Sequence, residues 1–476
     1  MDHPNVLILM SDEHRYDLAG FAGNDIVRTP VLDELARTGV VFDNCYSPSP
    51  ICVPARQCMM AGQLPKTCGV DGAWMDLAPN YHTFARRFGQ HAYKTVCAGK
   101  LHHLGDDQMQ GWQIRLHPDA HMMDKFYDGL IRREYERCTS GPSLSKMTDE
   151  MIVKAAASGE GKGRRFDRRA TEDLQYYIQS SCSAKARRPH LLKLSLIEPH
   201  YPYNIDRELF DFYYDSVPIF EEEPCGHPVL SLSQDNRPVR VTPEQIRRAT
   251  ATYYGMTEAV DTCYGRIMDA LEGQGHNLDE WIVVYVSDHG EMLGQHGIWE
   301  KSRFYEGSVR APMIIRYPQK LPGGTRVARN VNLCDLFATL CDLAEIPCQP
   351  GLDSRTLVPL MNGDGADWNN ESVSQIRRLG EDHVMIKQDD LKYQYYGEEI
   401  PEVLFDLAAD PGELRNCIDD PAYGERLVRF RRRLGELGYG PDGDSKYVNA
   451  GYMSGVEETP ASSGCLWPPD VNPWQV

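Results

Sequence analysis

Short segments that are apolar at nearly every position alternate along the chain with longer stretches in which apolar residues recur at helical spacing. Nearly continuous Val, Ile and Leu runs are typical of strands buried on both faces, and helical periodicity between them is typical of crossover connections. We therefore predict an α/β fold with a large, mainly parallel sheet flanked by helices. The predicted strands are Asn5 to Met10, Tyr93 to Ala98, Leu191 to Ile197 and Trp281 to Val286, and the predicted helices are Pro30 to Thr38, Thr171 to Ser181, Pro243 to Glu272 and Leu333 to Ala344.

The apolar pattern changes after the linker-like sequence Asn-Gly-Asp-Gly at residues 362–365. Two strand-like segments, His383 to Gln388 and Leu391 to Tyr396, flank the turn Asp389-Asp390 and predict a hairpin. A basic helical pattern follows near Glu425 to Glu436. We predict three parts: residues 1–362 as a large α/β domain, 363–437 as a small antiparallel α+β domain, and 438–476 as an extended tail rich in Gly, Pro and Ser.

The stretch from Gly105 to Asp167 interrupts the alternation of strands and helices. Its Gly-rich sequence at residues 158–163 predicts a surface loop. This sequence lacks the Lys-Ser/Thr spacing of a phosphate-binding P-loop, and no strand leads into the glycines. A nucleotide site of that type is therefore excluded.

The charge balance is acidic, with 50 Lys and Arg against 69 Asp and Glu in 476 residues and a formal net charge of −19. Such a surface repels nucleic acid and anionic lipid, so we expect neither as a partner, and an anionic substrate requires a local basic pocket. No apolar run reaches the roughly 18 to 20 residues that a bilayer span needs, and the first residues read as a strand, not a signal peptide. The 14 Cys show no CxxC pair. We expect a cytoplasmic protein with mostly reduced cysteines.

Each of the four predicted strands is followed directly by acids, histidines or a lysine. In an open parallel sheet the carboxyl ends of the strands share one edge, where ligands bind. One such sequence alone is explained by a polar turn or a helix cap, but four together favour a site. The four sequences are Ser11-Asp12-Glu13-His14, Gly99-Lys100-Leu101-His102-His103, Glu198-Pro199-His200 and Ser287-Asp288-His289-Gly290-Glu291.

Carboxylates and an imidazole at two of these strand ends predict a divalent cation site. Carboxylate oxygens of Asp12 and Asp288 and a ring nitrogen of His289 are suitable ligands. Glu13 is a weaker candidate, because adjacent residues in extended chain point to opposite sides. His14 and His103 have no such support, and we expect them to be structural.

A proline-rich segment between the first two strands leads into a short helical pattern around Cys52. With Pro54 as the first helical residue, Cys52 is expected just before the helix N-terminus, where free amides favour negative charge. Arg56 follows four residues after Cys52, so both side chains can face one pocket. A buried structural cysteine is the alternative explanation for Cys52 taken alone.

The sequence Cys52-x-Pro54-x-Arg56 matches the core motif recognised by the enzymes that oxidise cysteine to formylglycine. With the strand-end sequences, it makes the chain resemble the formylglycine-dependent sulfatases of the alkaline phosphatase superfamily. Other segments that carry the resemblance are Asn5 to Asp12, Lys301 with Glu306-Gly307-Ser308, and Leu404 to Leu407 with Asp410-Pro411-Gly412-Glu413. Within that family, the segments that look closest to choline sulfatases and phosphonate monoester hydrolases are Gly62 to Pro65, Gly105 to Gly111 and Met292 to Gly294.

The resemblance implies a sulfatase that hydrolyses a sulfate ester through a formylglycine made from Cys52 by a formylglycine-generating enzyme. The hydrated aldehyde would attack sulfur with one hydroxyl, and deprotonation of the second hydroxyl would then release sulfate. The implied catalytic residues are Cys52, Arg56, Lys100, His102, His200 and Lys301, and the implied metal ligands are Asp12, Glu13, Cys52, Asp288 and His289.

Each implied residue has a role in the family. Arg56 would hold the diol, while Lys100 and Lys301 would bind the sulfuryl oxygens as charge shifts to the leaving group. His102 would handle the diol proton, and His200 would protonate the departing alkoxide. For either lysine, the alternative is a solvated surface charge.

The chain departs from the family pattern at two positions. Ala61 stands before Gly62 where the family commonly has Thr, which leaves the Cys-Pro-Arg core intact. His289 stands where family metal sites often have Asn. An imidazole suits a transition metal better than calcium, so Mn²⁺ is the alternative to Ca²⁺ as the single divalent metal.

Two other functions fit the same residues. Phosphonate monoester or phosphodiester hydrolysis would use the same metal, nucleophile and cationic clamp, and a non-catalytic homologue would bind an anion with Cys52 unmodified. The expected substrate is a small anionic sulfate ester, such as a sulfated sugar or an aryl or alkyl sulfate. A homo-oligomer is expected from the resemblance, in which the tail beyond Gly438 can reach a neighbouring subunit.

Overall fold

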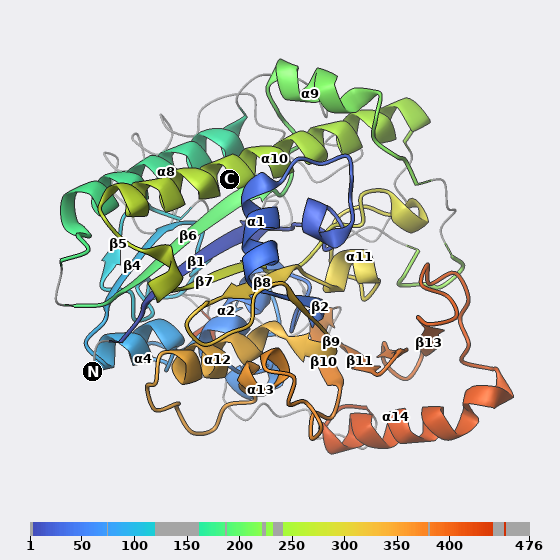
Figure 1. Ribbon diagram of the computed structural model, residues 1–476. Coiled ribbons are helices and arrows are strands. Elements are labelled where there is room, and N and C mark those ends of the chain that lie inside the picture. The colour runs from blue at the N-terminus through green and yellow to red at the C-terminus, as the bar shows by residue number, and fades with distance from the viewer. Residues whose placement is uncertain are drawn as a thin grey trace.

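The computed structural model describes residues 3–73, 75–119, 161–185, 188–220, 225–231, 241–378, 381–440 and 452–453. An eight-stranded sheet forms the centre of the molecule, in the order β5-β4-β6-β1-β7-β8-β2-β9 (Figure 1). All neighbouring pairs are parallel except those of β8 with β7 and with β2. The predicted α/β fold with a mainly parallel sheet is therefore confirmed. The strands are β1 (Asn5–Asp12), β2 (Val40–Tyr46), β4 (Lys94–Gly99), β5 (Ile114–Arg115), β6 (His190–Pro199), β7 (Trp281–Ser287), β8 (Met313–Arg316) and β9 (Thr325–Asn332).

Helices cover both faces of this sheet (Figure 1). Alternate residues of β1 enter opposite cores, because successive side chains of a strand point to opposite faces. Leu7 and Leu9 pack with α1, α8 and α10, whereas Val6, Ile8 and Met10 pack with α2, α4, α12 and α13. The helices are α1 (Pro30–Thr38), α8 (Lys162–Ser181) and α10 (Pro243–Gly273) on the first face, and α2 (Cys52–Ala61), α4 (Phe84–Gln90), α12 (Leu336–Leu343) and α13 (Val358–Met361) on the second.

The predicted helices agree closely with these bounds except at two N-termini. The helix predicted from Leu333 begins with a 3-10 turn, Leu333–Asp335, before α12. α8 begins at Lys162, nine residues before the predicted start at Thr171. The first turns are rich in Arg, but their buried residues Phe166 and Ala170 continue the spacing of Leu174, so the helix extends into the predicted loop. The loop prediction at residues 158–163 is therefore wrong for 162 and 163, and its first three residues lie outside the described ones.

A separate four-stranded antiparallel sheet follows α13, with α14 (Gly424–Glu436) packed on it through Leu427, Phe430 and Leu434 (Figure 1). The predicted hairpin is present, with Asp389 at its turn in a left-handed conformation (φ 49°). The proposed boundary at residue 362 falls between α13 and this sheet. Its strands are β10 (Glu371–Arg378), β11 (Glu381–Gln388), β12 (Leu391–Tyr395) and β13 (Val403–Asp406).

The remaining elements are short. β14 (Tyr452–Met453) pairs with β3 (Met75–Asp76), and the rest of the predicted tail beyond Gly440 lies outside the described residues. Along the described chain, no helix combines the length and the apolar character that crossing a bilayer requires. The other helices are α3 (Pro65–Cys68), α9 (Arg207–Tyr214) and α11 (Glu306–Val309).

Candidate active site

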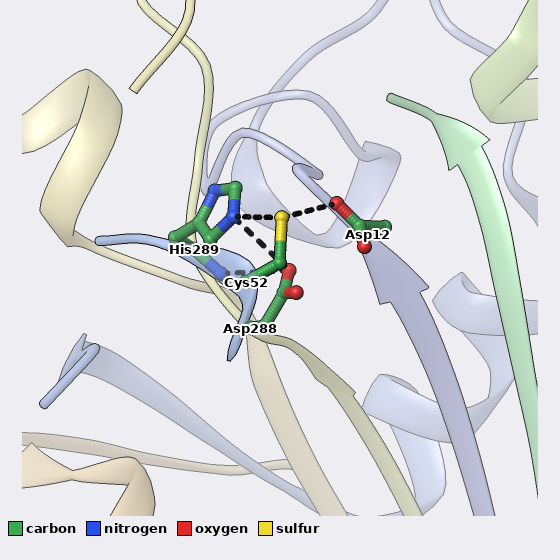
Figure 2. Close-up of side chains that lie close together, drawn as sticks. All are labelled: Asp12, Cys52, Asp288 and His289. Atoms are coloured by element: carbon green, nitrogen blue, oxygen red, sulfur yellow. Dashed lines mark hydrogen bonds and ion pairs between the residues drawn. The ribbon is translucent and has the colours of Figure 1, made fainter. Parts of the chain in front are cut away.

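The carboxyl ends of β1 and β7 bring two aspartates together. Asp12 is the last residue of β1, and Asp288 directly follows β7, its neighbour in the sheet. Asp12, Cys52, Asp288 and His289 each offer one ligand atom, and these four atoms lie within 4.8 Å of one another (Figure 2). All four residues are fully buried. The structure thus brings together three of the predicted metal ligands and the predicted nucleophile.

Cys52 occupies the first turn of a buried helix. It is the first residue of α2, not the residue before it as predicted, because the extended residue Ile51 serves as the N-cap and Pro54 is accommodated within the first turn. The Cys52 Sγ lies 3.2 Å from Nε2 of His289 and 3.5 Å from Oδ1 of Asp12 (Figure 2). Burial, reinforced by the Asp12 charge, raises the pKa of the thiol to about 11. An unmodified Cys52 is therefore a thiol, not a thiolate, near neutral pH.

Arg56, one turn after Cys52, bridges the two aspartates. Its Nη2 donates to Oδ2 of Asp12 at 2.8 Å, and its Nε donates to Oδ2 of Asp288 at 2.7 Å. Its Nη1 donates to the carbonyl oxygen of Lys100, whose Nζ lies 2.5 Å from Oδ2 of Asp12. One oxygen of each aspartate is therefore bound by cationic side chains.

The ring of His289 is oriented by its neighbour. Nδ1 lies 3.0 Å from the carbonyl oxygen of Gly290, which places the proton on Nδ1 and leaves the lone pair of Nε2 toward Cys52. Burial lowers the pKa of His289, which favours the neutral imidazole. A neutral imidazole with its second nitrogen on a carbonyl is a common arrangement for a metal ligand.

These residues fit a divalent cation. The group supplies two carboxylates and one neutral imidazole around side chain 52, all within reach of one ion. Because Arg56 binds Oδ2 of each aspartate, the Oδ1 atoms of Asp12 and Asp288 are the oxygens available to it. Asp288 Oδ1 also accepts backbone N–H groups of Glu13 and His289 at 3.0 Å, which fixes that carboxylate.

Glu13 belongs to a second cluster. Its backbone is left-handed (φ 62°), and its Oε2 lies 2.7 Å from Nζ of Lys301 and 3.3 Å from Nε2 of His200. Lys301 Nζ also donates to that His200 nitrogen at 2.6 Å. Burial opposes the charge on Lys301, but Cys52, Glu13 and Asp12 together raise its pKa. The structure thus places Glu13 in a group with Asp12 and His200, and only Asp12 is shared with the group that contains Asp288 and His289.

The predicted acid–base histidines occupy two buried turns. His200 follows β6, and its Nδ1 lies 2.5 Å from the carbonyl oxygen of Tyr201. Burial, followed by the charges of Lys301 and Lys100, lowers the pKa of His200 well below its usual value. His102 has a left-handed backbone (φ 61°), and its carbonyl accepts a hydrogen bond from Gln57 of α2 at 3.3 Å.

His14 and His103 make the contacts expected of structural residues. His14 hydrogen-bonds with the Tyr285 hydroxyl and, through Nε2, with the carbonyl oxygen of Leu18 at 2.7 Å. His103 Nδ1 lies 3.2 Å from the carbonyl oxygen of Gln108, and burial lowers the pKa of His103 to about 3.

Buried carboxylates that brace the site loops were missed in the sequence. Asp167 of α8 accepts the backbone N–H groups of Ile197 and Glu198 at 2.7 and 2.8 Å, just before His200. Asp119 accepts the N–H groups of Leu101 and His102. Both residues lie in the stretch with no clear periodicity. Only the spacing of the apolar residues along α8 would have indicated that Asp167 is buried.

Comparison with known proteins identifies the family of this chain. A family model described as Sulfatase matches residues 4–346, which is more than half of the chain. The chain belongs to the sulfatase family. A second model, described as N-sulphoglucosamine sulphohydrolase, C-terminal, matches residues 294–439 of this sulfatase.

Curated relatives of this sulfatase agree. It is 31% identical over 443 residues to a choline-sulfatase of Rhizobium meliloti (strain 1021), covering 88% of this chain and 83% of the relative. It is 28% identical over 452 residues to an arylsulfatase of Clostridium perfringens (strain 13 / Type A), covering 90% and 93%. The predicted family and enzyme class are confirmed: the chain is a sulfuric ester hydrolase.

Solved structures confirm the fold of this sulfatase. The phosphonate monoester hydrolase of Agrobacterium radiobacter superposes with a TM-score of 0.76 at 24% identity, covering 91% of this chain and 95% of that one. A protein solved in complex with its substrate D-glucosamine-2-N,6-O-disulfate superposes with a TM-score of 0.72 at 20% identity, covering 91% and 97%.

Proposed function

We propose that this sulfatase hydrolyses a small sulfate ester through a formylglycine derived from Cys52, with one divalent cation held by Asp12, Asp288 and His289. The observation that carries the proposal is the convergence of these three side chains on residue 52 within 4.8 Å. The Cys-x-Pro-x-Arg sequence around residue 52 supports the conversion. A formylglycine-generating enzyme is the partner needed for that maturation.

When bound, the cation would act as a Lewis acid that lowers the pKa of an oxygen on side chain 52. Arg56 aligns both aspartates through its bonds at 2.7 and 2.8 Å. Its position one turn into α2 also places a permanent positive charge beside residue 52. The protein thus supplies an anionic ligand set without an excess of buried negative charge.

We propose that Lys100 and Lys301 bind the sulfuryl oxygens. Lys100 pairs with Asp12, and Lys301 pairs with the neighbouring Glu13. Fixed cationic donors in a buried site stabilise charge that moves to the leaving group more strongly than water does. Glu13 is then the counter-ion of Lys301 and not a ligand in the four-residue group.

Proton transfer is assigned to the two histidines. We propose that His200 protonates the departing alkoxide with a proton that its Nε2 takes from the Lys301 ammonium, 2.6 Å away. His102, on the turn after Lys100, handles the proton of side chain 52. The His200 ring is held by the Tyr201 carbonyl and the Lys301 ammonium, and the backbone of His102 is fixed by Gln57.

The imidazole of His289 affects which metal ion the site prefers. Calcium prefers oxygen ligands, whereas imidazole nitrogen suits first-row transition metals. Ca²⁺ and Mn²⁺ are the two candidates, and His289 favours Mn²⁺. We further propose that the substrate is a sulfated sugar or an aryl or alkyl sulfate, that the enzyme is cytoplasmic, and that it forms a homo-oligomer.

Phosphonate monoester hydrolysis is the second candidate, because a phosphonate monoester is also a tetrahedral monoanion and would use the same cation, nucleophile and lysines. Parallel rates on a nitrophenyl sulfate and a phenyl phosphonate test the proposal. We expect the larger kcat/KM on the sulfate. This activity should be lost in Cys52→Ser, because serine has no sulfur to lose in forming the aldehyde. A much larger rate on the phosphonate would establish the second candidate, and full activity of Cys52→Ser would refute the nucleophile.

A further inference from the structure

Lys301 stands at the end of a compact loop that returns to the site from β7. The loop closes where the Met292 N–H donates to the Glu300 carbonyl at 2.9 Å. Lys301 is flanked by two non-glycine residues with left-handed backbones, Glu300 (φ 69°) and Ser302 (φ 66°). This conformation is unfavourable for L-residues, so surrounding contacts must hold it.

Backbone hydrogen bonds hold the residues on both sides of Lys301. The Ser302 N–H donates to the carbonyl oxygen of Pro50 at 3.0 Å, next to the nucleophile segment. The Glu300 N–H donates to Oε1 of Glu291 at 2.6 Å. The same carboxylate oxygen accepts the N–H of Leu293 at 2.8 Å, where the backbone is also left-handed (φ 51°). The Glu291 side chain is thus the support for one flank of Lys301.

The Glu291 carboxyl also lies near the Glu13 carboxyl, which is the partner of the Lys301 ammonium. Both Glu291 Oε2 and Glu13 Oε1 are buried and accept no hydrogen bond from the described residues. Burial raises the pKa of the Glu13 carboxyl, the charge of Lys301 lowers it, and the charge of the nearby Glu291 raises it further. The other oxygen of Glu13 holds Nζ of Lys301 at 2.7 Å. Glu291 therefore binds the backbone beside Lys301 and lies near the carboxyl group that binds the Lys301 side chain.

We propose that Glu291 is a positioning residue that sets Lys301 for binding the sulfuryl group. This inference rests on the proposed function, since it assumes that Lys301 binds the transferred group. The Arg15 guanidinium holds the Glu291 and Met292 carbonyl oxygens at 3.1 Å, so the main chain of the loop keeps an anchor when the Glu291 side chain is changed. The effect of a substitution is therefore expected at Lys301 and not as unfolding.

A double-mutant cycle tests the coupling. Glu291→Ala should lower kcat/KM for an aryl sulfate by about 10- to 100-fold, the range seen when a residue that orients an active-site group is removed. In a Lys301→Met background the same change should cost less than about threefold, because the group being positioned is gone. In the matched Lys100→Met background, Glu291→Ala should lower kcat/KM by the same factor as in the wild type, so that the losses from the two substitutions multiply. Glu291→Gln, which keeps an acceptor oxygen and can donate to Glu13, should retain most of the activity.

The same four-variant cycle is measured as the Kd for inorganic sulfate, so that it does not depend on turnover. Unfolding midpoint and aldehyde content at residue 52 serve as controls. The inference would be overturned if Glu291→Ala reduced kcat/KM or sulfate affinity as much in the Lys301→Met background as in the wild type. A Glu291→Gln variant as impaired as Glu291→Ala would also overturn it. A wild-type enzyme without activity on sulfate esters would instead contradict the proposed function, while the sulfate-binding cycle still decides the role of Glu291.

Discussion

Ser11 of β1 pairs with Ser287 of β7 in parallel register. Because the two strands run in register, Asp12 at the end of β1 and Asp288 directly after β7 lie side by side. Arg56 then joins them from α2 with bonds of 2.8 and 2.7 Å. Sheet register, and not sequence proximity, thus builds the ligand set from residues 276 positions apart.

Removing the bridge between the aspartates should destabilise the metal-free protein. Arg56 and both carboxylates are buried, so Arg56→Ala leaves charges without their partner, and we expect the free energy of unfolding to fall by about 3–5 kcal/mol. Urea unfolding of the metal-free enzyme measures this. The control is Arg207→Ala, whose ion pair with Asp211 is exposed and should contribute less than about 1 kcal/mol. If the two substitutions lowered the free energy of unfolding equally, the buried bridge would contribute no more to stability than an exposed ion pair.

Asp288→Ala should abolish metal-dependent activity. It removes a carboxylate whose Oδ1 faces the cation position and whose Oδ2 binds Arg56. We expect kcat/KM to fall by at least about 100-fold and metal content per chain to fall with it. Elemental analysis beside steady-state kinetics measures both. A variant that keeps its metal and its rate would place the cation elsewhere.

The strands and the site motifs were predictable from the sequence for a physical reason. Strands buried on both faces are apolar throughout, as in Trp281–Ser287, and polar residues then mark the edge of the sheet. The partnership of Glu13 with Lys301 was not predictable, because it depends on a left-handed turn at Glu13 and a loop that returns 288 residues later. The start of α8 was missed because arginines dominate its first turns.

His289→Asn should change the metal preference. An amide oxygen in place of the Nε2 lone pair gives an all-oxygen ligand set, which favours Ca²⁺ over Mn²⁺. We expect the ratio of activity with Mn²⁺ to activity with Ca²⁺ to fall by about tenfold or more relative to wild type, measured after chelation and reconstitution. An unchanged ratio would mean that His289 does not contact the cation.

A buried lysine beneath the site predicts a pH effect on stability. Burial, with Arg56 adding to it, lowers the pKa of Lys193 to about 7, whereas the unfolded value is about 10.5. Between these values the unfolded state binds more protons, so the unfolding free energy should rise with pH. Lys193→Met should be more stable than wild type by up to about 5 kcal/mol at pH 7, with the difference shrinking toward pH 10. A difference that does not vary with pH would refute the lowered pKa.

The most direct test of the central claim is the chemical state of residue 52. Peptide mapping of enzyme coexpressed with a formylglycine-generating enzyme, with hydrazide capture of aldehydes, should find the peptide containing residue 52 lighter than its cysteine form by about 18 Da, or captured as the hydrazone. Specific activity should increase in proportion to that fraction across preparations. A plain thiol at residue 52 in a preparation that cleaves sulfate esters at full rate would contradict the account.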